Sequence, residues 1–390
     1  KNVPELRFPG FEGEYSLDIF GNLATNKSDK FNPQNENASI DIELDCIEQN
    51  TGRLIKIYNS KEFSSQKNKF NPQNVLYGKL RPYLNKYYFT KKSGVCSSEI
   101  WVLKSTKEDK LLNLFLYYFI QTKRYSDVAS KSAGSKMPRA DWGLIENIRV
   151  YFPELCEQQK IGEFFSKLDR QIELEEQKLE LLQQQKKGYM QKIFSQELRF
   201  KDENGNDYPE WVVKLIGDIG KVAMNKRIYK HETSANEEIP FYKIGNFGKK
   251  ADTFISREQF NEYKEKYPYP KKGDILISAS GSIGKTIEYK GEEAYYQDSN
   301  IVWLDHNEEV LNVFLKYFYI LVKWNGVEGT TIKRLYNKNI LNTKIDLPTI
   351  SEQQKIGDFF CYIDNLIEIQ EQKLEFLKRR KQSLLQKMFV

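Results

Sequence analysis

A nine-residue segment occurs twice in this chain, and this repetition constrains the fold more than any other feature. The segment reads EQQKIGEFF at 157–165 and EQQKIGDFF at 352–360, so the copies differ only by one Glu/Asp exchange. Extending the comparison without gaps to 157–182 and 352–377 gives 17 identities in 26 positions. The tetrapeptide ELRF repeats as well, at 5–8 and 197–200. The chain is therefore an internal duplication of two long units and not a short-period solenoid.

The repeated segments continue into stretches with the apolar spacing of a long helix. Apolar residues recur at alternating steps of three and four, which is the heptad pattern of a coiled coil. The pattern predicts a helix over 157–195 and a second one after 348. A long amphipathic helix usually packs against its own domain, but these two copies share one seam pattern, so we expect them to cover each other's apolar stripe. The predicted seam consists of Phe165, Leu168, Ile172, Glu175, Leu179, Leu182 and Lys186 in the first helix, and Phe360, Ile363, Ile367, Gln370, Leu374, Leu377 and Lys381 in the second.

The polar seam positions suggest a register for this helix pair. We expect an antiparallel pair, in which a layers face d layers of the partner helix, so matching the polar positions places Glu175 opposite Lys381 and Gln370 opposite Lys186. One buried polar pair can fix the register of a coiled coil at some cost in stability.

The segments between the helices read as two mixed globules. Residues 75–103 and 273–304 show alternating and β-branched stretches broken by Gly and Pro, which indicates strands joined by turns. Each is followed by an apolar helix, predicted over 109–121 and 308–324, and then by a strand-like segment ending in proline at 153 or 348. The predicted class is α+β, with domains at 1–152 and 201–347 and helical spacers at 153–200 and 348–390.

Composition limits the classes of function. The 60 basic and 54 acidic residues give a net charge of +6, and residues 1–152, with 23 Lys and Arg against 17 Asp and Glu, hold this whole excess. Such a balance is compatible with a polyanionic partner. The four cysteines form no CxxC pair and no long apolar segment is present, so we expect a cytoplasmic protein without a membrane span. With only two histidines, no His-rich metal site is expected.

Two short motifs resemble catalytic loops but lack their essential residues. The stretch SASGSIGKT at 278–286 ends like a phosphate-binding loop, yet Ala279 occupies the position of its first glycine. It also leads into a strand-like run and not a helix, so we interpret it as a hairpin turn. The sequence FNPQN, at 31–35 and 70–74, has Gln and Asn where an amino-methyltransferase motif has proline and an aromatic residue, so turns explain both copies.

Several motifs together resemble the specificity subunits of type I restriction–modification enzymes. They are KLRPYLNK at 79–86, CSSEIWVL at 96–103, SKMPRADW at 135–142, GDILISASGSIGK at 273–285 and the two EQQKI spacers, and they extend over essentially the whole chain. The resemblance implies a non-catalytic DNA-binding protein in which each globule is a target recognition domain that reads one half of a bipartite, asymmetric DNA target.

The resemblance also implies partners. The helices would space the two domains and dock two modification (methyltransferase) subunits, and restriction (endonuclease and translocase) subunits would join outside them. The cofactors S-adenosylmethionine, ATP and Mg would then belong to these partners, and this chain would hold none. Two other classes stay open, namely a self-contained DNA methyltransferase or nuclease and a coiled-coil scaffold that binds only proteins. The first lacks a visible donor or carboxylate motif, and the second leaves the β-rich globules unexplained.

Candidate DNA-binding residues are basic and polar side chains on the predicted loops, because Lys and Arg contact phosphates while Arg, Asn, Gln and Ser also reach base edges. Each of them could instead be an ordinary solvated surface residue, and Arg81, which precedes a proline, could be structural. The candidates are Lys79, Arg81, Tyr83, Lys86, Ser135, Lys136 and Arg139 in the first domain, and Ser280, Ser282, Lys285, Gln297, Asn300, Thr331, Lys333 and Arg334 in the second.

Overall fold

The computed structural model describes residues 2–37, 39–131, 136–324 and 334–390. Internal contacts divide the chain into two compact units, each of which combines one globule with parts of both long helices. The first unit holds Lys1–Lys178 and Gln370–Val390, and the second holds Leu179–Ile369. Each globule thus forms one compact unit with the helical segments that contact it. The division into four parts at 152, 200 and 347 stays a prediction.

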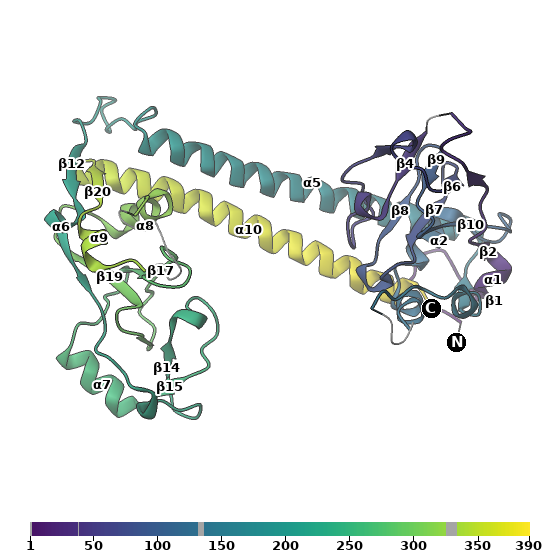
Figure 1. Ribbon diagram of the computed structural model, residues 1–390. Coiled ribbons are helices and arrows are strands. Elements are labelled where there is room, and N and C mark those ends of the chain that lie inside the picture. The colour runs from purple at the N-terminus through teal and green to yellow at the C-terminus, as the bar shows by residue number, and fades with distance from the viewer. Residues whose placement is uncertain (1, 38, 132–135, 325–333) are drawn as a thin grey trace. The chain divides into compact units, whose positions relative to one another are not determined.

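The globule of the first unit contains three sheets and four short helices within the described residues (Figure 1). One sheet has the antiparallel order β2-β10-β7-β8, a mixed sheet has the order β3-β6-β9-β4-β5, and β1 pairs with β11. The strands are β1 (Ser16–Ile19), β2 (Ala24–Thr25), β3 (Lys30–Phe31), β4 (Ile40–Ile42), β5 (Tyr58–Asn59), β6 (Lys67–Phe70), β7 (Val75–Gly78), β8 (Tyr87–Phe89), β9 (Gly94–Cys96), β10 (Ile100–Ser105) and β11 (Arg149–Phe152). The helices are α1 (Phe20–Leu23), α2 (Asn113–Phe119), α3 (Lys123–Ala129) and α4 (Trp142–Ile145).

The globule of the second unit repeats this plan in the part of the chain that the structure describes. An antiparallel sheet has the order β13-β19-β16-β17, a mixed sheet has the order β15-β14-β18, and β12 pairs with β20. The strands are β12 (Val212–Leu215), β13 (Gly220–Ala223), β14 (Ile239–Tyr242), β15 (Phe254–Ile255), β16 (Ile275–Ser278), β17 (Thr286–Glu288), β18 (Tyr295–Tyr296), β19 (Ile301–His306) and β20 (Lys344–Leu347). The helices are α6 (Ile216–Ile219), α7 (Arg257–Lys266), α8 (Asn312–Leu321) and α9 (Asn337–Leu341). The predicted α+β class and the duplication are confirmed.

Two long helices, α5 (Leu155–Phe194) and α10 (Ile350–Met388), contribute to both units. In the first unit, Phe165 contacts Phe389 with 6.2 Å between ring centroids, and Asp169 lies 2.7 Å from Lys381. In the second unit, Lys186 lies 2.6 Å from Asp364. Residue numbers that rise along one helix meet numbers that fall along the other, so the helices are antiparallel as predicted. None of the fourteen predicted seam residues is exposed.

The predicted register is wrong. Lys381 pairs with Asp169, and Glu175 accepts hydrogen bonds from Gln370 at 2.5 Å and Lys373 at 2.5 Å. Lys186 correspondingly pairs with Asp364 and not with Gln370. The reason is a partner outside the helices: a tyrosine hydroxyl of the globule donates to each aspartate, from Tyr118 to Asp169 at 2.9 Å and from Tyr317 to Asp364 at 2.8 Å.

The repeated nonapeptide attaches each helix to its own globule. The carboxylate of Glu157 is buried and accepts two hydrogen bonds from the Arg7 guanidinium, at 2.8 and 2.7 Å, and one from the Tyr15 hydroxyl at 3.1 Å. Glu352 forms the same two-pronged pair with Arg199, at 3.2 and 2.8 Å, and accepts from the Trp211 indole at 3.0 Å. Both arginines belong to the ELRF repeats, which explains why the two motifs are duplicated together.

The glutamine after each of these glutamates explains why two helices are shorter than predicted. Gln158 accepts a hydrogen bond from the Leu112 amide at 2.9 Å and donates to the Lys110 carbonyl at 2.7 Å. These bonds hold Leu112 in an extended conformation, with a φ of −81° and a ψ of 140°, so α2 begins only at Asn113 and not at 109. Gln353 makes the equivalent bonds to the Leu311 amide and the Glu309 carbonyl, and α8 begins at Asn312.

The glycine of the nonapeptide allows each long helix to contact the apolar helix of its globule closely. A Cβ atom at Gly162 would lie 2.6 Å from Leu114 of α2, and one at Gly357 would lie 2.5 Å from Val313 of α8. Gly188, also inside α5, has open space around it.

We therefore expect Gly162→Ala and Gly357→Ala to lower the free energy of unfolding by about 1–3 kcal/mol each, because an added methyl group overpacks a close contact. Gly357→Ala should cost more, since the β-branched Val313 is less able to move aside. The matched control Gly188→Ala should instead raise stability by about 0.5–1 kcal/mol, the usual gain from replacing glycine inside a helix. Urea unfolding curves of the three variants and the parent chain test this. Equal effects at all three positions would contradict the close-contact explanation.

Candidate nucleic-acid interface

The candidate DNA-binding residues that the structure describes lie on a three-segment rim that both globules build with the same backbone hydrogen bonds. In the first unit the Lys79 amide donates to the Glu99 carbonyl at 3.0 Å, and the Ala140 amide donates to the Lys79 carbonyl at 2.8 Å. In the second unit the Ala279 amide donates to the Asn300 carbonyl, and the Leu335 amide donates to the Ala279 carbonyl, both at 2.8 Å. We call these segments the rim: 79–86, 97–99 and 136–140 in the first unit, and 279–285, 297–300 and 334–335 in the second.

The rim gathers predicted residues that are far apart in sequence. Leu80 bridges to Arg139, and Ser280 bridges to Arg334, in equivalent antiparallel positions. In both units this places the turn of a hairpin, β7–β8 or β16–β17, beside the segment that follows the apolar helices. Ser135, Thr331 and Lys333 lie outside the described residues.

Among the candidate residues of the first rim, Arg81, Tyr83, Lys136 and Arg139 have exposed side chains. Lys79 is half-buried, and the Lys86 ammonium donates to the Leu44 carbonyl at 2.5 Å. Lys86 therefore attaches the hairpin to the chain at Leu44. Sequence reasoning did not foresee this contact because Leu44 is distant in sequence.

Arg139 is exposed but has a partner. Its Nε and Nη2 atoms donate to the two carboxylate oxygens of Glu99 at 2.9 and 3.0 Å. These hydrogen bonds hold the pKa of Glu99 below its usual value, so the carboxylate stays charged and neutralises Arg139. Any contact of Arg139 with a phosphate must compete with this two-pronged pair.

The second rim has Asn300 in place of Glu99 and keeps an arginine, Arg334, at the position of Arg139. The Ser280 hydroxyl donates to the Asn300 side chain at 2.9 Å, and Arg334 Nη2 donates to the Ser299 carbonyl at 2.9 Å. The Gln297 side chain accepts from the Ile244 amide at 3.1 Å, so it supports a loop as well as reaching the rim. Ser282 is exposed in the hairpin turn.

The structure confirms that the segment around Lys285 is a hairpin and not a phosphate-binding loop. Strands β16 and β17 pair directly, and no helix follows the turn. The Ser278 hydroxyl donates to the Ser282 carbonyl and accepts from the Lys285 amide, which closes the turn from inside. The Lys285 ammonium donates to the Phe247 carbonyl at 2.7 Å. The two FNPQN copies are turns as predicted, with Asn35 donating to Asn32 and Asn74 donating to Asn71.

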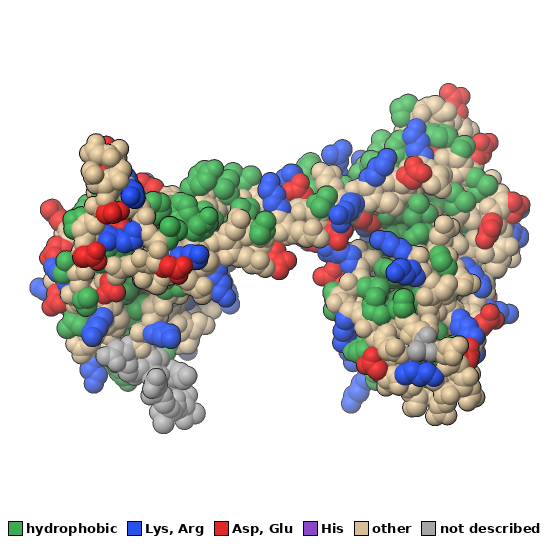
Figure 2. Space-filling model, turned by 90° about the horizontal axis from the view of Figure 1, so that it is seen from above, with side chains coloured by type: hydrophobic (Ala, Val, Ile, Leu, Met, Phe, Trp, Pro, Cys, Tyr) green, Lys and Arg blue, Asp and Glu red, His purple; other side chains and the backbone are tan. Residues whose placement is uncertain are grey.

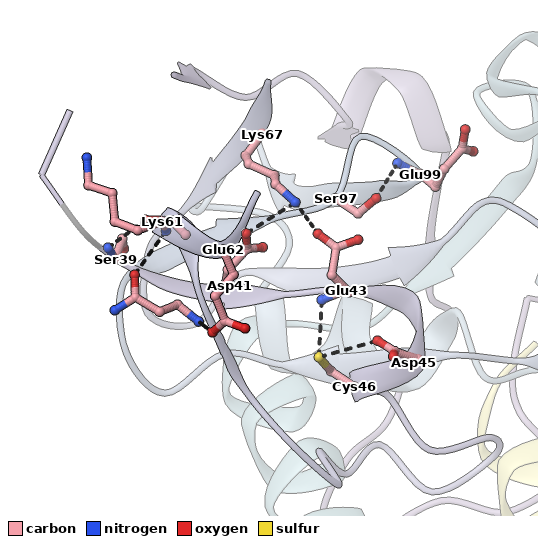
Figure 3. A network of polar contacts seen from close by, with 12 residues as sticks. Ser39, Asp41, Glu43, Asp45, Cys46, Lys61, Glu62, Lys67, Ser97 and Glu99 are labelled. Carbon is pink, nitrogen blue, oxygen red and sulfur yellow. Dashed lines mark hydrogen bonds and ion pairs between the residues drawn. The ribbon is translucent and has the colours of Figure 1, made fainter. Parts of the chain in front are cut away.

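A buried ionic cluster lies beside the first rim, in the mixed sheet (Figure 3). The Lys67 ammonium of β6 lies between the carboxylates of Asp41 and Glu43, at 3.2 Å from Asp41. Asp41 and Lys67 are almost fully buried. Burial raises the pKa of Asp41 to about 6 despite the opposing effect of Lys67. Sequence reasoning missed this cluster, although alternation of acidic and apolar residues at 40–43 was a possible signal.

Comparison with known proteins agrees with this duplicated arrangement. The family model described as "Type I restriction modification DNA specificity domain" matches residues 14–184 and again residues 208–379. These two matches cover most of the chain. The chain belongs to this family. Each matched copy of the specificity domain contains one complete rim and the first part of one long helix.

Individual relatives carry related names. A Haemophilus influenzae protein, whose name assigns it to the type I restriction enzyme specificity subunits, is 42% identical over 261 residues. That alignment covers 64% of this chain and 63% of the relative, which is just under two thirds of it. A Methanocaldococcus jannaschii protein, named as the MjaVIII specificity subunit, is 27% identical over 76% of this chain and 74% of its own length.

A solved structure shows the same fold. The type I restriction–modification S subunit from M. genitalium has a TM-score of 0.59 at 16% identity, covering 100% of this chain and 99% of the other. In the described part of this family member, no helix is both long and apolar enough to cross a bilayer.

The buried cluster predicts a specific pH dependence. Because the folded-state pKa of Asp41 lies above its value in the unfolded chain, the folded state binds this proton more tightly. Its contribution to stability is therefore present at low pH and is lost as pH rises from about 4 to about 6. In urea unfolding at a series of pH values, Asp41→Asn should gain stability relative to wild type through this window and then run parallel to it.

The control is Asp18→Asn. A hydrogen bond from Asn22 lowers the pKa of Asp18, so this variant should lose stability relative to wild type as pH rises. Parallel curves for Asp41→Asn and wild type between pH 4 and 6 would show that Asp41 has an ordinary pKa.

Proposed function

We propose that this chain is the DNA-recognition subunit of a type I restriction–modification complex, in which each globule reads one half of a bipartite, asymmetric target. The observation that carries this proposal is the rim, because one backbone frame occurs twice with different side chains. Lys79, Arg81 and Glu99 of the first rim correspond to Ala279, Gly281 and Asn300 of the second. A shared backbone frame lets both globules approach DNA in the same manner, and different side chains let them read half-sites of different sequence.

Members of this class act in complexes with methyltransferase and restriction subunits and DNA. The helices of this chain offer a surface for such partners. Leu174 and Phe376 of the first unit and Leu181, Tyr362 and Ile369 of the second are large apolar side chains that stay exposed on α5 and α10. All five occupy the same position of the heptad, and hydrophobic side chains on the helical surface are visible in Figure 2. Exposed apolar rows of this kind mark interaction sites.

We further propose that these rows dock two copies of a methyltransferase subunit. Four of the five residues follow the internal repeat, since Leu174 corresponds to Ile369 and Leu181 to Phe376 in the aligned helices, whereas Tyr362 corresponds to Lys167. A duplicated surface suits two identical partners. The methyl donor S-adenosylmethionine, and the ATP and Mg used in restriction, would be bound by the partner subunits, and this chain would supply recognition without catalysis.

Exchanging one globule tests the recognition proposal. Residues 1–154 should be replaced by the matching segment of another family member that keeps the arginine and glutamate equivalent to Arg7 and Glu157. This boundary keeps β1 and β11 together and leaves α5 intact. We expect methylation-site mapping in cells that contain the chain and its methyltransferase to show one changed half-site and one unchanged half-site. A change in both halves, or in neither, would contradict independent reading by the two globules.

Placing a charge in the apolar rows tests the partner proposal. Ile369→Glu should weaken copurification with the methyltransferase subunit at least tenfold, because a buried, unpaired carboxylate opposes association. Ile55→Glu is the matched control, since Ile55 is equally exposed, at 65% against 61%, but lies on a globule. Circular dichroism should show both variants to be folded. If both variants copurify equally with the methyltransferase subunit, this helical surface is excluded as its docking site.

A further inference from the structure

The backbone of Arg81 has a conformation that its sequence opposes twice. Its φ of 53° and ψ of 60° lie in the left-handed region, which costs a residue with a side chain about 1–3 kcal/mol. The next residue is Pro82, and the residue before a proline prefers extended backbone angles. Glycine would remove the first conflict at no steric cost.

The rim holds Arg81 in this conformation. Its amide donates to the Pro138 carbonyl at 2.7 Å, and the neighbouring Leu80 bridges to Arg139. Pro82 is buried at the start of the 3-10 turn Pro82–Leu84. The backbone from which the Arg81 side chain extends is therefore held in one position.

The second rim shows that this turn does not require arginine. Gly281 occupies the equivalent position with a φ of 65°, and Ser282 follows where the first rim has proline. The same frame thus forms without either conflict, so the strain at Arg81 is not needed for folding of a rim of this type. Strained residues that persist cluster at functional sites.

The Arg81 side chain is exposed and makes no hydrogen bond or ion pair with any other residue that the structure describes. Two of its basic neighbours are engaged, since Arg139 is paired with Glu99 and Lys86 is bonded to Leu44. Among the described residues, Arg81 thus has no partner for its guanidinium, and its backbone is held in place by the first rim.

We propose that Arg81 makes a two-pronged contact with acceptor atoms of the DNA, and this rests on the function proposed above. The planar guanidinium fork fits two parallel acceptors, which DNA offers as two phosphate oxygens or as O6 and N7 of guanine. A fixed backbone loses less entropy when such a contact forms, which gives a reason for the strained position. Lysine, with a single ammonium on a flexible stem, does not reproduce this geometry.

The experiment uses the full chain assembled with its methyltransferase subunits and a DNA duplex that carries the mapped wild-type target. Arg81→Gly should relieve the backbone conflict, so its thermal unfolding midpoint should equal or exceed that of wild type. Its affinity for the target should nevertheless fall about tenfold or more. On a logarithmic scale, the affinity of Arg81→Lys should lie closer to that of Arg81→Gly than to that of wild type. Asn85→Gly is the control, because Asn85 is also left-handed, with a φ of 47°, in the same turn.

The outcomes separate the alternatives. If Asn85→Gly weakens binding as much as Arg81→Gly, then a loosened turn explains the loss and the proposal fails. Wild-type affinity in Arg81→Gly also overturns it. A lower salt dependence of the remaining affinity identifies a phosphate as the acceptor, whereas relaxed preference at one base pair identifies guanine. If the wild-type complex itself shows no specific binding, the proposed function fails, independently of Arg81.

Discussion

The buried pairing of one arginine with one glutamate is the contact on which each unit depends. Arg7 with Glu157, and Arg199 with Glu352, join the start of a long helix to a segment far away in sequence. Taking both charges out of water is costly, and such pairs add little net stability compared with apolar packing. Removing one partner, however, leaves an uncompensated charge that typically costs about 3–5 kcal/mol. The pair therefore acts mainly as a constraint on geometry, because other arrangements of helix and globule leave a buried charge without its partner.

This constraint explains which residues of the chain are duplicated most faithfully. The nonapeptide supplies a glutamate for the ion pair, a glutamine for the loop before the apolar helix, a glycine for close helix contact, and apolar residues for the core. Each of these side chains faces the interior of its own unit. The frame of each rim is made by backbone groups, so the rim side chains that face solvent carry no such shared constraint. Folding thus preserves the attachment of the helix in both copies, while the rims are free to differ.

The same difference between interior residues and rim side chains explains which features could be predicted from the sequence. Duplication and heptad spacing are regular, and they correctly predicted two α+β globules and an antiparallel pair of long helices. The helix register failed because charge matching considered only the helices, whereas Tyr118 and Tyr317 of the globules fix Asp169 and Asp364. For the rim, turn chemistry predicted the turns that the structure shows, while contact with DNA stays a prediction. It could not show that Arg139, Lys86 and Lys285 are engaged, since Glu99, Leu44 and Phe247 are distant in sequence.

The polar residues of the helix seam also account for the direction of pairing. Lys186 and Lys381 occupy equivalent positions of the repeat, as do Asp169 and Asp364. If the two copies of the helix paired in parallel and in register, each lysine would face its own counterpart, and each aspartate likewise. Such pairs would bury like charges. In the antiparallel arrangement the lysine of each helix meets the aspartate of the other, at 2.6 and 2.7 Å. A duplicated sequence can thus specify an antiparallel partner, provided that opposite charges lie on either side of its midpoint.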